Sequence, residues 1–265
     1  MGQCFIVRRG GLNEKRKTPD NWVFHQAYTT DGTFIVFESG WYRIFAVGKS
    51  GDGANGSGAH GGGSGGTGGI ACSLLYLKAD EEVPITVNDA LSSFGSYLSA
   101  TAGTTPTGQS GGIAGVAEGG NVSNESGYAG TSGGTGRSSA SGDNGSDGLN
   151  GGAKGGNCGG NYISNRPHAG GGAGGSRLPA LNCPYVSEPY TATFSGGSGG
   201  YAGDTHGSAG ADASAYPEFI VGPAMVLYGS GSGGGGRSYN NDASGNGGAR
   251  SKGTPGVVII EKGVN

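Results

Sequence analysis

Aromatic, arginine and histidine side chains gather in the polar segments that separate the glycine runs in the second half of the chain. Tyrosine offers a rigid contact surface with a polar hydroxyl, and neighbouring Ser, Gly and Asn residues add adaptable hydrogen-bonding groups. The pattern therefore predicts a surface that recognises another molecule, or, as the alternative, rings that cap a glycine-rich structure against water. The candidate recognition residues are Tyr162, Asn165, Arg166, His168, Tyr185, Tyr190, Tyr216, Phe219, Arg237 and Tyr239.

Catalytic and nucleotide-binding motifs do not emerge from the sequence. Residues 51–56 match GxGxxG, but more glycine follows where a dinucleotide site needs a helix. Gly48, Lys49 and Ser50 resemble the end of a P-loop, yet Arg43 stands where its first glycine belongs. There is no GxSxG elbow, and none of the four histidines has the spacing of metal ligands. We therefore expect no enzyme and no cofactor.

One short turn offers oxygen ligands. Asp143 and Asp147 lie in a Gly-Asp-Asn-Gly-Ser-Asp-Gly sequence, and hard oxygen ligands of this kind bind calcium. A single copy cannot stack into a repeated calcium-binding structure, so a solvated turn is the competing interpretation.

Composition and charge exclude several classes of protein. Glycine supplies 64 of 265 residues, far above its usual share of about 7%. The net charge of −3 and the pI of about 5.8 argue against a nucleic-acid binder, which would have a basic face. The chain has no apolar run long enough to span a membrane, and residues 2–20 do not resemble a secretory signal. Four free thiols are expected, with a disulfide between Cys158 and Cys183 as the alternative.

Strand-like segments dominate the first hundred residues and the carboxyl end. Runs of β-branched and aromatic residues predict strands over 4–8, 21–29, 33–38, 41–47, 70–78, 82–87, 94–100 and 256–262. No segment keeps an apolar period of 3.6 residues over the length of a helix. The expected class is therefore mainly β with irregular structure and almost no α-helix.

Glycine recurs at every third residue in two stretches. Between residues 127 and 151, eight of nine such positions are glycine, and Ser139 is the exception. Between 53 and 68 only Ala59 breaks the series. The period matches the polyproline II conformation, which has three residues per turn and no internal hydrogen bonds. Proline is too scarce for collagen, so we expect several short polyglycine II helices that hydrogen-bond to one another.

Energetics require these helices to form a bundle with an anchor. Ordering a residue costs on the order of 1–2 kcal/mol, whereas each hydrogen bond contributes about 1 kcal/mol net. A lone helix would not persist. We expect a β-sandwich-like base over residues 1–103, including the glycine run 48–69 and completed by 256–262. Residues 104–255 are expected to form the polyglycine II bundle, with loops at its tip.

The order of these segments resembles that of glycine-rich phage tail proteins. Residues 41–48, the glycine run 51–69, residues 83–88, the Ser-Phe-Gly turn at 93–95 and the closing strand 255–261 carry the resemblance. The chain is similar in principle to the tip adhesin of T-even-type long tail fibres, a layered polyglycine II structure with variable receptor-binding loops. The amino-terminal part differs from the fibre-attachment domain of that family.

The resemblance implies a receptor-binding protein of a phage or phage-like tail. It would be made in the bacterial cytoplasm, reside in the virion tail, and bind a bacterial surface glycan or surface protein. Other tail or fibre proteins would be its assembly partners, and both a homotrimer and a single copy are compatible with the family. Two alternatives remain open: a purely structural tail-tip or baseplate component, and an antifreeze protein with a flat ice-binding face.

Overall fold

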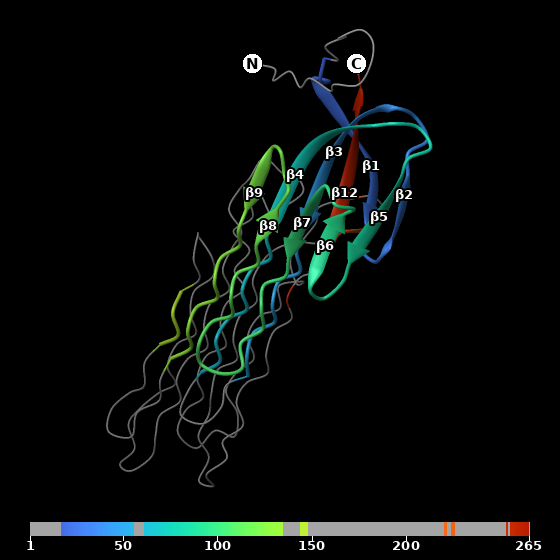
Figure 1. Cartoon of the computed structure of the whole chain (residues 1–265). Coiled ribbons are helices and arrows are strands. Elements are labelled where there is room, and N and C mark those ends of the chain that lie inside the picture. Colours follow the sequence, from blue (N-terminus) through green and yellow to red (C-terminus); the bar gives the residue numbers. More distant parts are fainter. Residues whose placement is uncertain are drawn as a thin grey trace, which may run out of the picture.

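The structure is a computed structural model that describes residues 17–55, 61–134, 144–147, 220–221, 224–225, 253 and 255–264. The described part is all-β, contains no helix, and has two five-stranded antiparallel sheets that face each other (Figure 1). The described part is therefore β-rich, as expected, and its two facing sheets match the expected β-sandwich-like base. Strand segment 4–8 of the expected set lies outside the described residues.

The first sheet has the strand order β1-β12-β3-β4-β9, and the second has the order β2-β5-β6-β7-β8. The first contains β1 (Asn21–Tyr28), β12 (Val257–Val264), β3 (Gly40–Val47), β4 (Ile70–Leu77) and β9 (Ser123–Glu125). The second contains β2 (Gly32–Ile35), β5 (Glu82–Val87), β6 (Leu91–Phe94), β7 (Leu98–Thr101) and β8 (Ala117–Glu118). A short hairpin, β10 (Ile220–Val221) and β11 (Ala224–Met225), stands apart from both.

Side chains of alternate residues fill the space between the sheets, as the two-residue period of a strand requires. Phe34, Tyr42 and Phe94 are fully buried, and their rings meet at centroid distances of 5.6 and 5.9 Å. The core ends in alanines, because Ala46 pairs with Ala71 in the first sheet and Ala100 pairs with Ala117 in the second. These short side chains stand immediately before the glycine-rich segments and let the two sheets converge there.

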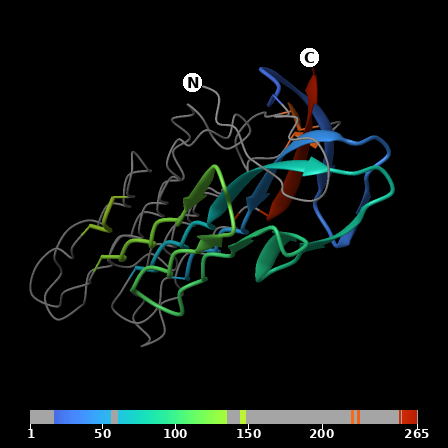
Figure 2. The same ribbon diagram turned by 45° about the horizontal axis from the view of Figure 1, so that its top comes forward.

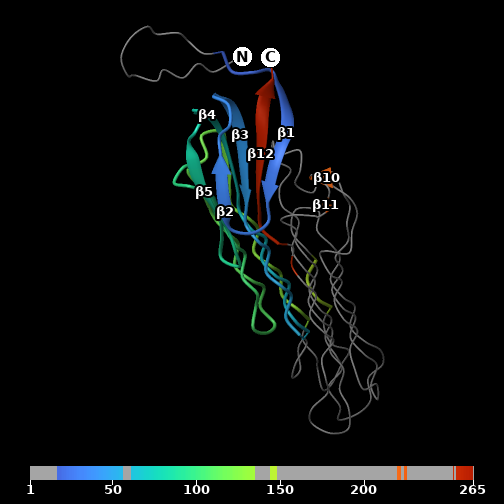
Figure 3. The same ribbon diagram turned by 90° about the vertical axis from the view of Figure 1, so that its right-hand side faces the viewer.

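The outer face of the first sheet is also buried along β3, β4 and β12. Six side chains there are at most 2% exposed: Phe45, Val47, Ile70, Cys72, Val257 and Ile259. Farther along the same strands, the guanidinium of Arg43 forms an ion pair with Glu261, which is only 1% exposed. Figure 3 shows the hairpin β10–β11 on the side of this sheet that faces away from the second sheet. Because β12 is buried on both faces of the first sheet, its sequence begins with a continuous run of apolar residues.

One expected strand is wrong. Residues 94–100 were expected as a single strand, but they contain the end of β6, the turn at 95–97 and most of β7, with Phe94 opposite Leu98. Gly95 has a φ of 52°, a left-handed conformation that glycine adopts without steric cost. A hairpin follows because the chain reverses at this glycine.

Element bounds otherwise lie within a few residues of the expected strands. Four short strands fall inside residues 104–255, where only glycine-rich helices and loops were expected: β8 and β9, and the hairpin strands β10 and β11. Strand β8 pairs with β7 and β9 pairs with β4, so each five-stranded sheet gains one short edge strand.

Candidate functional site

The pairing of β3 with β4 does not stop where the strands end. Val47 is opposite Ile70, and the next residues, Gly48 and Gly69, remain opposite each other. Backbone hydrogen bonds then recur at every third residue with the register unchanged: Gly48 N to Gly69 O (2.9 Å), Gly51 N to Gly66 O (2.8 Å) and Ala54 N to Gly63 O (2.8 Å). The glycine segments are therefore direct extensions of sheet strands, as Figure 2 shows.

Two further strand pairs extend in the same way. The β7–β8 register continues with Thr101 N to Val116 O (2.7 Å) and Thr104 N to Ile113 O (2.9 Å). The β4–β9 register continues with Thr67 N to Tyr128 O (2.9 Å), Ser64 N to Thr131 O (3.0 Å) and Gly61 N to Gly134 O (2.8 Å). Both sheets thus lead into one hydrogen-bonded array, which we call the glycine array and define as residues 48–55, 61–69, 101–116 and 126–134.

The two sheets join inside the glycine array. Stacked sheets lie about 10 Å apart because side chains separate them. In the array, by contrast, backbone groups of the two layers hydrogen-bond directly: Gly69 N to Thr101 O (3.1 Å), Gly66 N to Thr104 O (3.1 Å) and Gly63 N to Gly108 O (2.8 Å). Loss of the side-chain layer converts two stacked sheets into a single network.

Residues 61–69 form the buried centre of the glycine array. All nine are buried, and their N–H groups donate alternately to residues 101–108 and 128–134. Their carbonyl groups accept hydrogen bonds from residues 48–54 and from Gly112 and Gly115. Since an unpaired buried backbone group is costly, this network is what allows a segment without apolar side chains to be buried.

Steric contact explains why glycine is required at the centre. A β-carbon on Gly62, Gly65 or Gly68 would lie 2.0 Å from a carbonyl oxygen of residues 48–54. Small hydroxyl residues occupy other positions and bond to the backbone: Ser64 Oγ accepts from Thr131 N (2.7 Å), and Thr67 Oγ1 accepts from Tyr128 N (2.6 Å).

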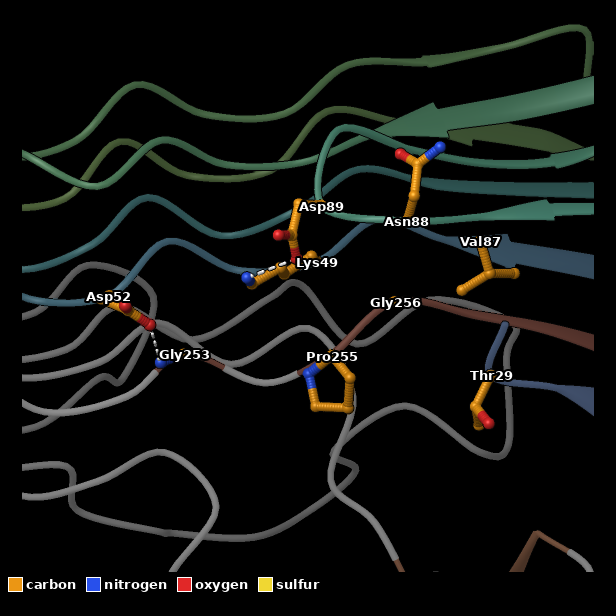
Figure 4. A pocket seen from close by; sticks show the side chains of 9 residues that line it. All are labelled: Thr29, Lys49, Asp52, Val87, Asn88, Asp89, Gly253, Pro255 and Gly256. Carbon is orange, nitrogen blue, oxygen red and sulfur yellow. Dashed lines mark hydrogen bonds and ion pairs between the residues drawn. The ribbon is translucent and has the colours of Figure 1, made fainter. Parts of the chain in front are cut away.

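A cavity of about 430 Å³ lies where the sandwich meets the glycine array (Figure 4). Four chain segments that adjoin strands of both sheets contribute to it. We call it the junction pocket, and its lining residues are Thr29, Lys49, Asp52, Val87, Asn88, Asp89, Gly253, Pro255 and Gly256.

Charged groups on two sides of the junction pocket are held in place. Lys49 Nζ donates to Asp89 Oδ1 at 2.7 Å, and this contact holds the pKa of the Asp89 carboxyl below its ordinary value. Asp52 Oδ1 accepts from Gly253 N at 2.8 Å. Asn88 is fixed by its own turn, since its Oδ1 accepts from Ala90 N (2.9 Å) and Leu91 N (3.0 Å). The described part of the lining therefore carries an ammonium, two carboxylates and an amide.

The sequence-predicted recognition residues, from Tyr162 to Tyr239, lie outside the described residues, as do Asp143, Cys158 and Cys183. Asp147 is described and is exposed. No group of three or more His, Cys, Asp or Glu side chains that could hold a metal occurs within the described ranges. The recognition and cation predictions therefore remain predictions.

Sequence reasoning missed the junction pocket. Lys49 and Asp52 belong to the two motifs that were rejected as nucleotide-binding signatures. One signal for a site was present: Lys49 and Asp52 are the only Lys, Arg, Asp or Glu residues in the glycine run 48–69. Their partners Asp89 and Gly253 are distant in sequence, so the residue pattern did not indicate the cavity itself.

Among the described residues, no helix is long and apolar enough to cross a membrane. No protein-family model matches the chain, and no curated protein matches it significantly.

Proposed function

We propose that this chain is a receptor-binding protein of a phage or phage-like tail, in which a rigid glycine scaffold displays recognition loops to the bacterial surface. The observation that carries the proposal is the unbroken register from β3–β4, β7–β8 and β4–β9 into the glycine array. An extension anchored by both sheets can hold distant loops in fixed positions, which lowers the entropic cost of binding.

We further propose that the array continues through residues 104–255 as a bundle of polyglycine II helices. Hydrogen bonds at every third residue support this, because three residues per turn is the period of that helix. Contacts of residues 61–69 with neighbours on several sides also support it, since such helices direct backbone groups outward around the axis. The glycine series at 127–151 extends the same period along the sequence.

Recognition is assigned to the segments between glycine runs. The described glycine segments leave one end of the sandwich, and the carboxyl end of β12 lies at the opposite end (Figure 1). Turns at the far end of such a bundle would bring together the segments that contain the ten candidate residues. Tyr, Arg, His and Asn suit a glycan or a polar protein surface, because they combine flat contact area with hydrogen bonding.

The sandwich would then serve as the attachment part. Other tail or fibre proteins are the expected partners there, with either one copy or a homotrimer per fibre. The virion tail is the expected location, after synthesis in the bacterial cytoplasm. The acidic balance, with a net charge of −3, supports a partner other than nucleic acid.

Adsorption of the purified, fluorescently labelled chain to a panel of bacterial strains tests the proposal. We expect saturable binding to a subset of strains, competed by unlabelled chain. Replacing segments 161–169 and 176–194 with Gly/Ser sequences of equal length should abolish binding without changing the unfolding midpoint. If the replaced segments leave adsorption intact, recognition lies elsewhere on the chain and its assignment to these segments is overturned. If the native chain adsorbs to no strain while the replacements disrupt particle assembly, the purely structural alternative replaces this proposal.

A further inference from the structure

Strand β1 is the longest edge strand in the described part of the chain. It has eight residues, whereas the edge strands β2, β9 and β8 have four, three and two. Within the described residues β1 pairs with β12 alone, and Figure 1 shows it beside that strand. An edge strand presents a row of backbone N–H and C=O groups to which another strand can add. The outer side of β1 is therefore a template for strand addition.

The usual protection against strand addition is sparse along β1. Native edges carry charged side chains, proline or bulges, or another segment covers them. Strand β1 (Asn21–Tyr28) contains no Lys, Arg, Asp, Glu or Pro, and its one irregularity is the bulge between Phe24 and Gln26. The edge strand β2 is shorter, and the carbonyl of Thr33 there already accepts from the hydroxyl of Tyr28 at 2.9 Å. Cover by another segment is the device that remains for β1.

Apolar side chains beside this edge are partly open to solvent. Val23 is 46% exposed and Phe24 is 39% exposed. Removing such apolar surface from water is favourable. An occupant that suits the edge must therefore bring apolar side chains as well as backbone hydrogen-bonding groups. A short extended segment of mainly apolar polypeptide brings both, as in strand addition to other exposed sheet edges.

Residues 4–8 of this chain, Cys-Phe-Ile-Val-Arg, are a segment of this kind. They lie outside the described residues, and their aromatic and β-branched side chains favour a strand. Only residues 9–20 separate them from β1, and strands that follow one another in sequence are usually neighbours in space. Arg8 is their one charged residue, and β1 has no Lys or Arg that would repel it.

The connecting chain is long enough to reach the outer side of β1. Pro19 packs against β12, because a β-carbon on Gly263 would lie 2.3 Å from its Cγ. A strand added outside β1 would lie two strand spacings from β12, or about 10 Å. Residues 9–16 span up to roughly 26–29 Å when extended, which exceeds that distance. Antiparallel pairing is expected, because a parallel neighbour usually needs a helical crossover.

We propose that the outer edge of β1 is a strand-acceptor site and that residues 4–8 of the same chain occupy it as an added antiparallel strand. The added strand would pair the outward backbone groups of β1 and reduce the exposure of Val23 and Phe24. It would also keep other chains from adding to this edge. The site lies on the sandwich, separate from the loops between the glycine runs, so the proposal goes beyond the proposed function and does not depend on it.

Disulfide crosslinking of the full chain at low protein concentration tests the proposal. Cys4 supplies one thiol, and Phe24→Cys or Gln26→Cys supplies the other. The bulge places these two positions opposite Glu261 and Ile260, which are consecutive on β12, so the two variants sample both faces of the sheet. Paired residues of antiparallel strands have the Cα separation that a disulfide needs.

Glu118→Cys is the matched control, because Glu118 is exposed on β8, an edge strand of the other sheet. Cys158 and Cys183 are replaced by serine in every variant. Burial raises the pKa of Cys72 to about 12, so its thiol stays protonated and does not compete. Unfolding midpoints establish that each variant is folded.

We expect a disulfide within one chain from Cys4 to position 24 or 26, identified by mass spectrometry of the digested protein, in several-fold higher yield than to position 118. Replacing both Ile6 and Val7 with proline removes two adjacent N–H groups, one of which must point toward β1. That change should lower the yield several-fold, whereas Ile6→Val should leave it unchanged.

Three results would overturn the proposal. Neither position may exceed the yield at position 118, the double proline variant may crosslink as well as the parent, or the disulfides may join two chains. In the last case a second copy occupies the edge. Adsorption to bacteria is scored separately, so failure here leaves the proposed function standing.

Discussion

Gly65 and Gly51 approach so closely that a β-carbon on Gly65 would lie 2.0 Å from the carbonyl oxygen of Gly51. Both residues belong to the glycine array, and Gly65 is buried. Backbone atoms cannot yield as a flexible side chain can, so even one methyl group must push the two segments apart.

Gly65→Ala is therefore expected to lower the free energy of unfolding by at least about 3 kcal/mol, the upper range for overpacking a rigid interior. Gly108→Ala is the matched control, because a β-carbon there meets nothing within 4 Å. That variant should be neutral or should gain up to about 1 kcal/mol through reduced chain entropy in the unfolded state. Urea unfolding of the two proteins measures the contrast, and equal stabilities would contradict the role assigned to backbone contact.

Thr104 stabilises the edge of the glycine array through its hydroxyl. Its Oγ1 accepts from Ile113 N at 2.7 Å, beside the backbone bond between the same two residues. Thr104→Val should cost about 1 kcal/mol, the usual net contribution of one hydrogen bond. Thr104→Ser keeps the hydroxyl and should cost clearly less. Denaturant midpoints compare the pair, and a larger loss in Thr104→Ser would show that the methyl group, rather than the hydroxyl, matters.

Arg43 neutralises a carboxylate inside the first sheet. Glu261 is 1% exposed, and the guanidinium also lies 5.1 Å from the ring centroid of Trp22 and 5.5 Å from that of Phe45. Arg43→Met should destabilise the fold by about 3–5 kcal/mol, because it removes the cation that neutralises a buried carboxylate. The double variant Arg43→Met with Glu261→Leu should recover a large part of that loss. Urea unfolding of the parent, the two single variants and the double variant gives a double-mutant cycle. If the losses of the two single variants simply add in the double variant, the role assigned to Arg43 is contradicted.

His25 makes stability depend on pH in a defined direction. Its ring lies 5.8 Å from Phe34 and 5.9 Å from Tyr42, and burial followed by the charge of Lys262 lowers its pKa from the ordinary value of 6.5. The unfolded chain then binds more protons than the folded chain just below pH 6.5. The contribution to stability is fully present above that pH and falls as the solution is acidified through the lowered folded-state pKa.

His25→Gln should flatten this part of the pH profile between neutral and mildly acidic solution. Urea unfolding of both proteins across that window gives the comparison. Carboxylates such as Glu38 change the stability only at lower pH, because the hydrogen bond from Lys262 is the chief cause that lowers the pKa of Glu38 from 4.5. A profile that stays equally steep in His25→Gln would assign the dependence to another group.

Much of the sandwich could be predicted because strand signals are local. β-branched and aromatic residues mark 82–87 and 41–47 as strands wherever these segments fold, so their bounds follow from the residues themselves. A Ser-Phe-Gly turn at 93–95 was recognised through the resemblance, but the expected strand 94–100 ran through it, since Phe94 and Leu98 look alike whether they continue one strand or face each other across a turn. The junction pocket could not be predicted, because Lys49 and Asp89 meet only after two different sheets are stacked.

The residue pattern alone determined that the chain would be β-rich and that glycine would recur at every third position. Only the tertiary structure decided which glycine segments become neighbours. Segments without side chains carry no shape or polarity with which to choose a partner, and any two of them could form the same backbone hydrogen bonds. Their pairing is inherited instead from β3, β4 and β7, whose side chains set a register that the glycine residues then continue.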